Sequence, residues 1–296
     1  MAWIGVVLVA DAVRLPQLGP GAALPLDAEL LRQLVLGVGT WLVLVLALRR
    51  ESGLVRASTL VVVVLATAVE YTFSPLLQAY VYRIGTVPLF VPPGHGLVYL
   101  AALSIGRSPV VRAHSRLAVG LTVAAGTAWS GYGLLLTGRP DALGAFWFAC
   151  LVGFLCWGRN RLLYVGAFVV VSYLELVGTR LGTWAWAARD PVLGLVGQGN
   201  PPSGAAGGYG WFDLYAGLAA PSLLALSAGA AASIRSASSW RRPFVARALP
   251  PKQPSTPSTE VNLPPASTTI GTSAAMSYSC SSGSAATSTA PSATSM

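Results

Sequence analysis

Long runs of apolar residues, separated by short charged breaks, dominate the first 235 residues of the chain. A helix that crosses a bilayer needs about 20 mostly apolar residues, and seven windows approach this length. The segment 1–13 is apolar too, but it is short and contains Asp11, so residues 1–30 predict a partial helix or an outward loop. The pattern predicts an all-α transmembrane helical bundle with seven or eight spans. The seven windows are approximately 31–48, 55–73, 88–106, 117–136, 142–157, 161–179 and 210–234.

The amino-acid composition indicates that this bundle is surrounded by lipid. Hydrophobic residues make up 54% of the 296 residues and charged residues only 10%, and the mean hydropathy is +0.62. A water-soluble domain of this length would need more ionic groups on its surface. We therefore expect a multi-pass protein of the cell membrane.

Basic residues alternate between the breaks, as the preference of Lys and Arg for short cytoplasmic loops requires. Four breaks are rich in them, and the three breaks between those carry only Arg83, Arg139, and Arg180 with Arg189. The alternation places the C-terminal tail in the cytoplasm and the loops after the second, fourth and sixth helices outside. The net charge of +9 thus has a topological cause, and we expect no nucleic-acid partner. The basic residues of the rich breaks are Arg49, Arg50, Arg56, Arg107, Arg112, Arg116, Arg159, Arg161, Arg235, Arg241, Arg242, Arg247 and Lys252.

The composition changes abruptly near Ser236 to Ser, Thr, Pro and Ala. So few large apolar side chains cannot bury enough surface to offset the entropy lost on ordering. The sequence therefore divides into a transmembrane helical domain at 31–235 and a disordered cytoplasmic tail at 236–296.

Two segments of the membrane domain share an order of features and predict an internal repeat, with copies at about 31–106 and 142–234. Each has a Glu near the end of an apolar helix, an aromatic-x-aromatic pair, a Pro, and then Pro-Pro followed closely by Gly. The glutamates lie four helices apart, so both face the same side and the copies would be related by an axis along the membrane normal. The first copy has Glu70, Tyr80, Tyr82, Pro88, Pro92, Pro93 and Gly94, and the second has Glu175, Trp184, Trp186, Pro191, Pro201, Pro202 and Gly204.

Glu70 and Glu175 are the main candidates for chemistry. A carboxylate in hydrocarbon costs on the order of 2.5–3.5 kcal/mol and needs a partner, a proton or water. Two such groups brought together could divide the work, one as a proton donor and the other as an ionised stabiliser of a carbocation. They could instead carry protons or bind a cation, or they could anchor the helix ends at the interface by pairing with Arg83 and Arg180.

His95 opens the third helix and could relay a proton or coordinate a metal, although a single His at a helix start is commonly structural. The other histidine, His114, falls in a cytoplasmic loop, so the sequence predicts no zinc site, and no cofactor motif is present. Aromatic, basic and polar side chains near the outward loops are either an interface belt or the lining of an apolar substrate site. These substrate-binding candidates are Tyr82, Arg83, Arg180, Trp184, Trp186, Asn200, Ser203 and Asp213.

The stretch "GQGNPPSGAAGGYGWFD" at 197–213 is too rich in glycine for a helix. Pro201 and Pro202 are suited to open the last helix, with Asn200 or Ser203 as its cap. The glycines would let the backbone enter at membrane depth where it lines a cavity. The stretch is therefore a binding loop or a plain re-entrant turn.

Two stretches, "VPLFVPPGHGLVYLAA" and "LELVGTRLGTWAW", resemble the carotenoid-biosynthesis membrane proteins that include the carotenoid 1,2-hydratases. The resemblance covers about 66–220. It implies a multi-pass, cofactor-free protein that adds water to a terminal isoprenoid double bond by protonation, with Glu70 and Glu175 as acid candidates. The insertion Gly199–Gly208 and the "PPGH" segment depart from the family pattern.

Our leading hypothesis is an integral membrane protein that acts on an isoprenoid or other lipid by acid-base chemistry in the outer half of the membrane. One alternative is a small proton- or cation-coupled transporter that uses Glu70 and Glu175. Another is a noncatalytic, envelope-associated membrane protein.

Overall fold

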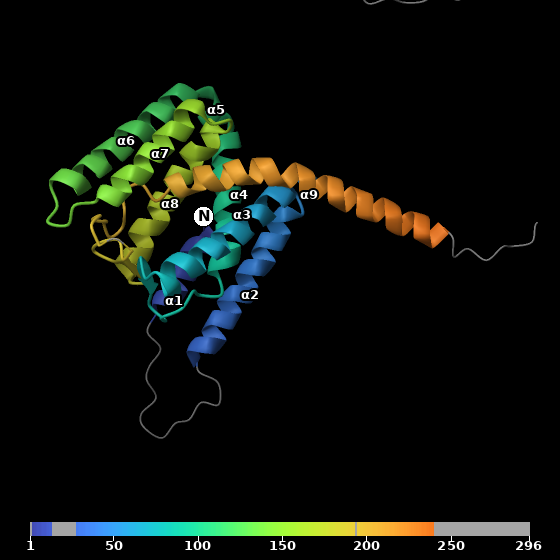
Figure 1. The fold of residues 1–296 in the computed structure, drawn as a ribbon, viewed down its shortest axis with the longest axis horizontal. Helices are drawn as coiled ribbons and strands as arrows, with labels where there is room; N and C mark the ends of the chain where they lie inside the picture. The colour runs from blue at the N-terminus through green and yellow to red at the C-terminus, as the bar shows by residue number, and fades with distance from the viewer. Residues whose placement is uncertain (1, 14–27, 193, 240–296) are drawn as a thin grey trace, which may run out of the picture. The chain divides into compact units, whose positions relative to one another are not determined.

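The computed structural model describes residues 2–13, 28–192 and 194–239, and this part of the chain is mostly helical (Figure 1). Each of the seven predicted windows coincides with a helix, and residues 2–12 form a further short one. The helices are α1 (Ala2–Ala12), α2 (Ala28–Leu48), α3 (Gly53–Tyr71), the π-helical turn η1 (Thr72–Leu76), α4 (Val91–Arg107), α5 (Pro109–Ala113), α6 (Ser115–Leu135), α7 (Ala142–Trp157), α8 (Arg161–Leu181) and α9 (Gly207–Ser239).

Three segments in the described ranges are long and apolar enough to cross a membrane: Ala28–Leu48, Gly53–Leu76 and Arg161–Leu181. Helix α2 also exposes large apolar side chains such as Val38, 67% exposed, and Leu42, 57% exposed. An exposed aliphatic surface of this kind suits lipid and not water, so these helices indicate a membrane protein. Helix α9 continues to Ser239, past the predicted start of the tail, and the rest of the tail lies outside the described residues.

A two-stranded sheet corrects the all-α prediction. Strand β1 (Tyr80–Tyr82) pairs antiparallel with strand β2 (Trp184–Trp186), so that Val81 lies opposite Ala185. Three residues are too few for the alternating pattern that predicts a strand. The aromatic-x-aromatic spacing was visible in the sequence, but the pairing of two segments about 100 residues apart was not.

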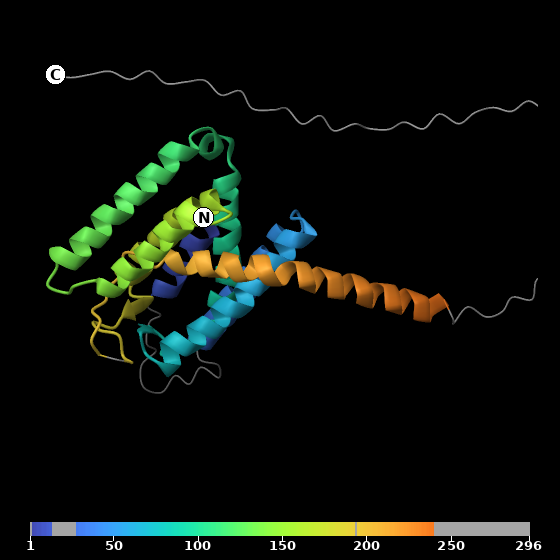
Figure 2. The same cartoon turned by 45° about the horizontal axis from the view of Figure 1, so that its top comes forward.

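The helices pack in crossed pairs: α4 against α8, and α3 against α9. Helices α6 and α7 form a hairpin on one side, where they lie next to each other in both views (Figures 1 and 2). A glycine permits the close approach of α4 and α8, because a Cβ on Gly166 of α8 would lie 2.3 Å from the carbonyl oxygen of Ala102 in α4. Small residues at such contacts are typical of helices that associate in lipid.

The three connections predicted to face outward contact one another. Gln198 donates from Nε2 to the carbonyl oxygen of Ala79 at 2.8 Å. Arg139 donates from Nε to the carbonyl oxygen of Gln198 at 2.6 Å. The connections after α3, α6 and α8 therefore gather at one end of the helices, as their predicted common side requires.

We expect Gly166→Ala to destabilise the protein, because the added methyl group meets backbone and the two helices must separate. Overpacking of this kind costs about 1–3 kcal/mol, so the thermal midpoint of the purified protein in detergent should fall. Gly120→Ala in α6 is the control, since nothing lies within 4 Å of the Cβ it would add. Equal midpoints for the two variants would contradict the close α4–α8 contact.

Candidate functional site

Glu70, in the last turn of α3, is a buried carboxylate held by hydroxyl groups. Tyr80 and Tyr82 of β1 both donate to its Oε2, at 2.8 and 2.7 Å. The side chain of Glu70 is 9% exposed. Burial, followed by the nearby charge of Glu70, raises the pKa of both tyrosines far above the ordinary value. They therefore remain protonated and keep donating throughout the physiological range.

Glu175 of α8 has the corresponding arrangement with indole groups. Trp184 and Trp186 of β2 donate from Nε1 to its Oε2, at 3.0 and 2.9 Å. No hydrogen bond to its Oε1 is recorded from any described residue. One oxygen of Glu175 is thus held in place and the other is left available.

Pairing of the two strands brings these units together. Tyr80 lies opposite Trp186 and Tyr82 opposite Trp184, and the rings of Tyr80 and Trp186 are 4.5 Å apart between centroids. Because each aromatic pair holds its own glutamate, the ribbon fixes both carboxyl groups in relation to one another. Both line one cavity.

His95, near the start of α4, connects Glu70 to α9. Its Nε2 lies 2.9 Å from Oε1 of Glu70, and its Nδ1 lies 2.8 Å from the hydroxyl of Tyr209. A neutral ring with its proton on Nε2 satisfies both contacts, since Nε2 then donates to Glu70 and Tyr209 donates to Nδ1. The side chain of His95 is 18% exposed and also lines the cavity.

The cavity has a volume of about 750 Å³, within the range of pockets that hold small ligands. Its wall is mainly apolar and aromatic, and helix α1 contributes one side of it. The polar groups are concentrated around the two glutamates and His95. Side chains from α1 in the wall are Trp3, Ile4, Val7 and Leu8.

The glycine-rich stretch lies beside this cavity, held by a buried carboxylate. Asp141, 2% exposed, accepts hydrogen bonds from the backbone N–H groups of Gly144, Gly199 and Ser203 at 3.0, 2.7 and 2.7 Å. Gln198, Pro202 and Ala205 of the stretch line the cavity. Part of it is therefore a wall of the site.

Three expectations for this stretch were wrong. Despite its glycines, the part at 207–213 is helical. Pro201 and Pro202 do not open the last helix, because α9 begins at Gly207. Asn200 does not cap it, since its Oδ1 accepts from the backbone N–H of Trp186 at 3.0 Å, and the Ser203 hydroxyl accepts from Ser130 at 3.0 Å. The polar side chains of the stretch instead fasten it to β2 and α6.

Of the predicted substrate-binding residues, Tyr82, Trp184 and Trp186 line the cavity. Arg180 and Asn200 border a separate, smaller depression. The remaining three, Arg83, Ser203 and Asp213, make contacts away from the cavity wall.

Asp213 is a buried carboxylate that joins three helices. Tyr99 of α4 donates to its Oδ1 at 3.0 Å, Tyr164 of α8 donates to its Oδ2 at 2.9 Å, and the Asn160 amide donates to both oxygens. All of its acceptor positions face donors from the protein. Asp213 is thus explained by packing of the bundle.

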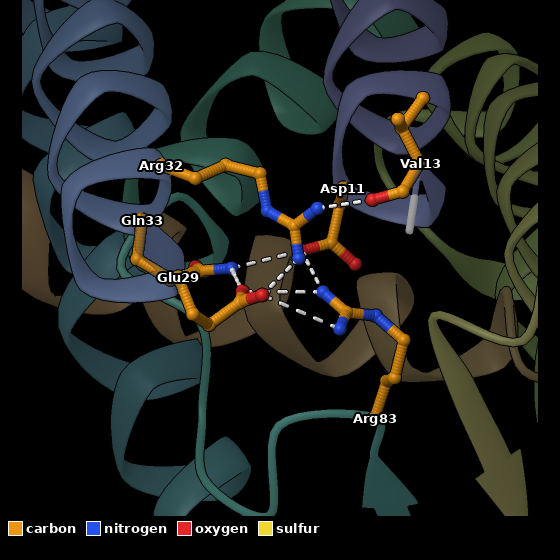
Figure 3. Close-up of polar contacts among 6 residues, drawn as sticks. All are labelled: Asp11, Val13, Glu29, Arg32, Gln33 and Arg83. Atoms are coloured by element: carbon orange, nitrogen blue, oxygen red, sulfur yellow. Dashed lines mark hydrogen bonds and ion pairs between the residues drawn. The ribbon is translucent and has the colours of Figure 1, made fainter. Parts of the chain in front are cut away.

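Arg83 pairs with acids of α1 and α2 and not with Glu70, which corrects the predicted interfacial pairing. Its Nη2 lies 3.2 Å from Oδ1 of Asp11 and 3.2 Å from Oε1 of Glu29 (Figure 3). Gln33 also donates to Asp11, at 2.8 Å. Among the described residues, no ion pair joins Arg180 to Glu175. The Arg83 cluster instead fastens α1 to the connection that carries Tyr82.

Sequence reasoning missed Tyr209, Gln198 and the α1 wall as parts of the site. Tyr209 lies 114 positions from His95, and no local pattern marks it. Within the described ranges, no group of three or more His, Cys, Asp or Glu side chains gathers to hold a metal ion.

Comparison with family models, with curated proteins and with solved structures found no match for this chain. The resemblance to the carotenoid hydratases therefore stays a hypothesis.

We expect Arg83→Gln to lower stability, because Asp11, 1% exposed, would keep a charge without its cation. Combining it with Asp11→Asn should restore part of the loss. The coupling between the two changes should be about 1–3 kcal/mol, measured by thermal or denaturant unfolding of the purified protein. Arg180→Gln is the control for the removal of an arginine. If the losses of stability in Arg83→Gln and Asp11→Asn simply add in the double variant, the pairing is contradicted.

Proposed function

We propose that this protein is an integral membrane enzyme that adds water to a carbon–carbon double bond of an isoprenoid or other apolar lipid. The observation that carries the proposal is the difference between two carboxyl groups in the wall of one apolar cavity. Glu70 accepts three hydrogen bonds over both oxygens, whereas the Oε1 of Glu175 has no recorded bond from the described residues.

Glu175 is the proton donor in this proposal. Its Oε1 transfers a proton to one carbon of the double bond, and the π electrons form the new C–H bond. The adjacent carbon becomes a carbocation, which ring faces and the ionised Glu70 stabilise. The indole N–H groups on Oε2 then stabilise the Glu175 carboxylate that is left.

His95 accepts the proton that is released when water adds. Water attacks the carbocation through its oxygen, and its surplus proton passes by way of the Tyr209 hydroxyl to Nδ1 of His95. The imidazolium that forms is stabilised by Glu70, 2.9 Å from Nε2. Return of this proton to Glu175 through cavity water closes the cycle, so the net reaction consumes only water and the alkene and needs no cofactor.

The same proposal includes the finer architecture. We place seven spans in the cell membrane, with the C-terminal tail in the cytoplasm and the site in the outer half. An internal repeat is supported by helix packing. Helices α3 and α8, which carry the two glutamates, correspond to each other, as do α4 and α9, and each glutamate-bearing helix packs against the second helix of the other copy. The β1–β2 pair and the two Glu–aromatic units support the repeat as well. The reaction class follows the resemblance of two sequence stretches to the carotenoid hydratases, and it is proposed together with that resemblance.

A proton- or cation-coupled carrier is the second candidate. It is favoured by one observation: Tyr99 and Asp213 bond to each other one helical turn away from His95 and Tyr209, on the same two helices. The two hydrogen-bonded pairs, one turn apart, form a row of titratable side chains that runs from the cavity further into the bundle, as a path for protons would require.

We expect Glu175→Gln to lower hydration by about 100-fold or more, the contribution typical of a general acid. The assay is incorporation of heavy oxygen from labelled water into squalene or geranylgeraniol by the purified protein in liposomes, read by mass spectrometry. Glu51→Gln should leave the rate unchanged. Glu51 pairs with Arg107 beside the start of α3 and the end of α4, whereas Glu70 and His95 lie at the other ends of these two helices.

Wild-type rates in both Glu175→Gln and Glu70→Gln would overturn the catalytic assignment. Proton flux in proteoliposomes, measured with a pH-sensitive dye and lost in the same two variants without any labelled product, would favour the carrier.

A further inference from the structure

The cavity has an opening on the apolar surface of the helices. Several side chains that line it are also exposed, and none of these is charged. On the α3–η1 side they are Ala68, Val69 and Phe73, with Val69 37% and Phe73 40% exposed. On the α9 side they are Trp211 and Tyr215, 41% and 52% exposed.

The two borders belong to helices that separate toward the cavity. Helices α3 and α9 are in contact, with Gly53 at the start of α3 close to Leu224 of α9, and the end of α3 diverges from the start of α9 in both views (Figures 1 and 2). Val69 is the neighbour of Glu70, and Trp211 follows Tyr209 by two residues. The opening therefore lies at the level of the proposed reacting groups.

On the side of the cavity toward the gathered connections, Gln198 and the two tyrosines of β1 are buried. Gln198 is 0% exposed, and Tyr80 and Tyr82 are 7% and 6% exposed. Arg139 ties this region down by donating to the carbonyl oxygens of Gln198, Trp186 and Ala187. Pro191 and Val192 of the α8–α9 connection also line the cavity and are exposed, but the half-buried Asp190 lines it beside them, so this border, unlike the one between α3 and α9, carries a charged residue. A ligand thus has a freer path between α3 and α9 than past the β1–β2 pair.

We propose that this opening is a lateral entrance from the hydrocarbon of the membrane, and that its ligand is the chain of a lipid whose apolar end reacts. The inference rests on the proposed function and adds the substrate class and its orientation. The apolar end enters first and reaches the carboxyl groups. The rest of the chain leaves between α3 and α9 into the bilayer, because the cavity of about 750 Å³ has the size of a pocket for a small ligand only.

The borders fit this use. Apolar side chains exposed at an opening are costly in water, but lipid solvates them. No charge must be displaced as the chain passes. Trp211 and Tyr215 offer ring faces to an unsaturated chain, and such contacts tolerate sliding because they are not directional hydrogen bonds.

The test is photolabelling with hexadecanol that carries a diazirine at its apolar end, in proteoliposomes of the full chain. Ala68→Trp narrows the opening. It should reduce labelling of the peptides that contain His95 and Tyr209 on the order of tenfold, which corresponds to about 1.4 kcal/mol in binding. Val64→Trp is the matched control, since Val64 is 59% exposed one turn earlier on α3 and does not line the cavity.

Labelling of α2 provides the internal reference for lipid contact, and an unchanged thermal midpoint shows that both variants are folded. Equal labelling of the cavity peptides in wild type, Ala68→Trp and Val64→Trp would overturn the entrance. No turnover is needed for this readout, so failure of the hydration proposal and failure of the entrance are separate results.

Discussion

The bonding of buried carboxyl groups by neutral aromatic donors is the constraint on which this structure depends. Leaving a carboxylate in hydrocarbon costs on the order of 2.5–3.5 kcal/mol even by insertion measurements, and each hydrogen bond to a charged group returns about 1.5–3 kcal/mol. Two or three such bonds therefore suffice. The short β1–β2 pair is the device that supplies them, because it presents Tyr80 and Tyr82 to Glu70, and two tryptophans to Glu175, from one rigid ribbon. Arginine could also have donated to these acids, but it would have added a formal charge to the cavity wall.

Hydrogen-bond partners separate the acids that hold the fold together from the acid that we propose as the proton donor. Asp141 and Asp213 accept hydrogen bonds on both oxygens from groups that hold a loop or a helix junction. Glu70 is bonded on both oxygens as well, yet one of its donors is His95, which can change its proton. Glu175 alone among these four has an oxygen with no recorded protein donor, and it lies in the cavity wall. Exposure separates them in the same way, because Glu175 is half-buried while Glu70, Asp141 and Asp213 are buried.

Sequence reasoning was accurate where the signal is local. An apolar run long enough for a span predicts a helix because lipid leaves the backbone no other partner, and all seven windows are helical. The spacing of Glu70 and Glu175 from their aromatic pairs marked the acids. Contacts made by helix packing left no local trace: His95 meets Tyr209 across 114 positions. The prolines misled for a related reason. Pro92 and Pro93 lie in the first turn of α4, whereas Pro201 and Pro202 precede α9 by several residues, because the backbone there is held by Asp141 and Asn200.

The difference between tyrosine and tryptophan gives the two carboxyl groups unequal routes for protons. A tyrosine hydroxyl both donates and accepts, so the groups around Glu70, which include His95 and through it Tyr209, can pass a proton along. An indole N–H only donates, so the two tryptophans on Glu175 stabilise its charge without offering a path. A proton reaches or leaves Glu175 only through its other oxygen, and that oxygen is available to the cavity. In the proposed reaction, this arrangement directs the Glu175 proton to whatever occupies the cavity, and protons released there are taken up on the Glu70 side.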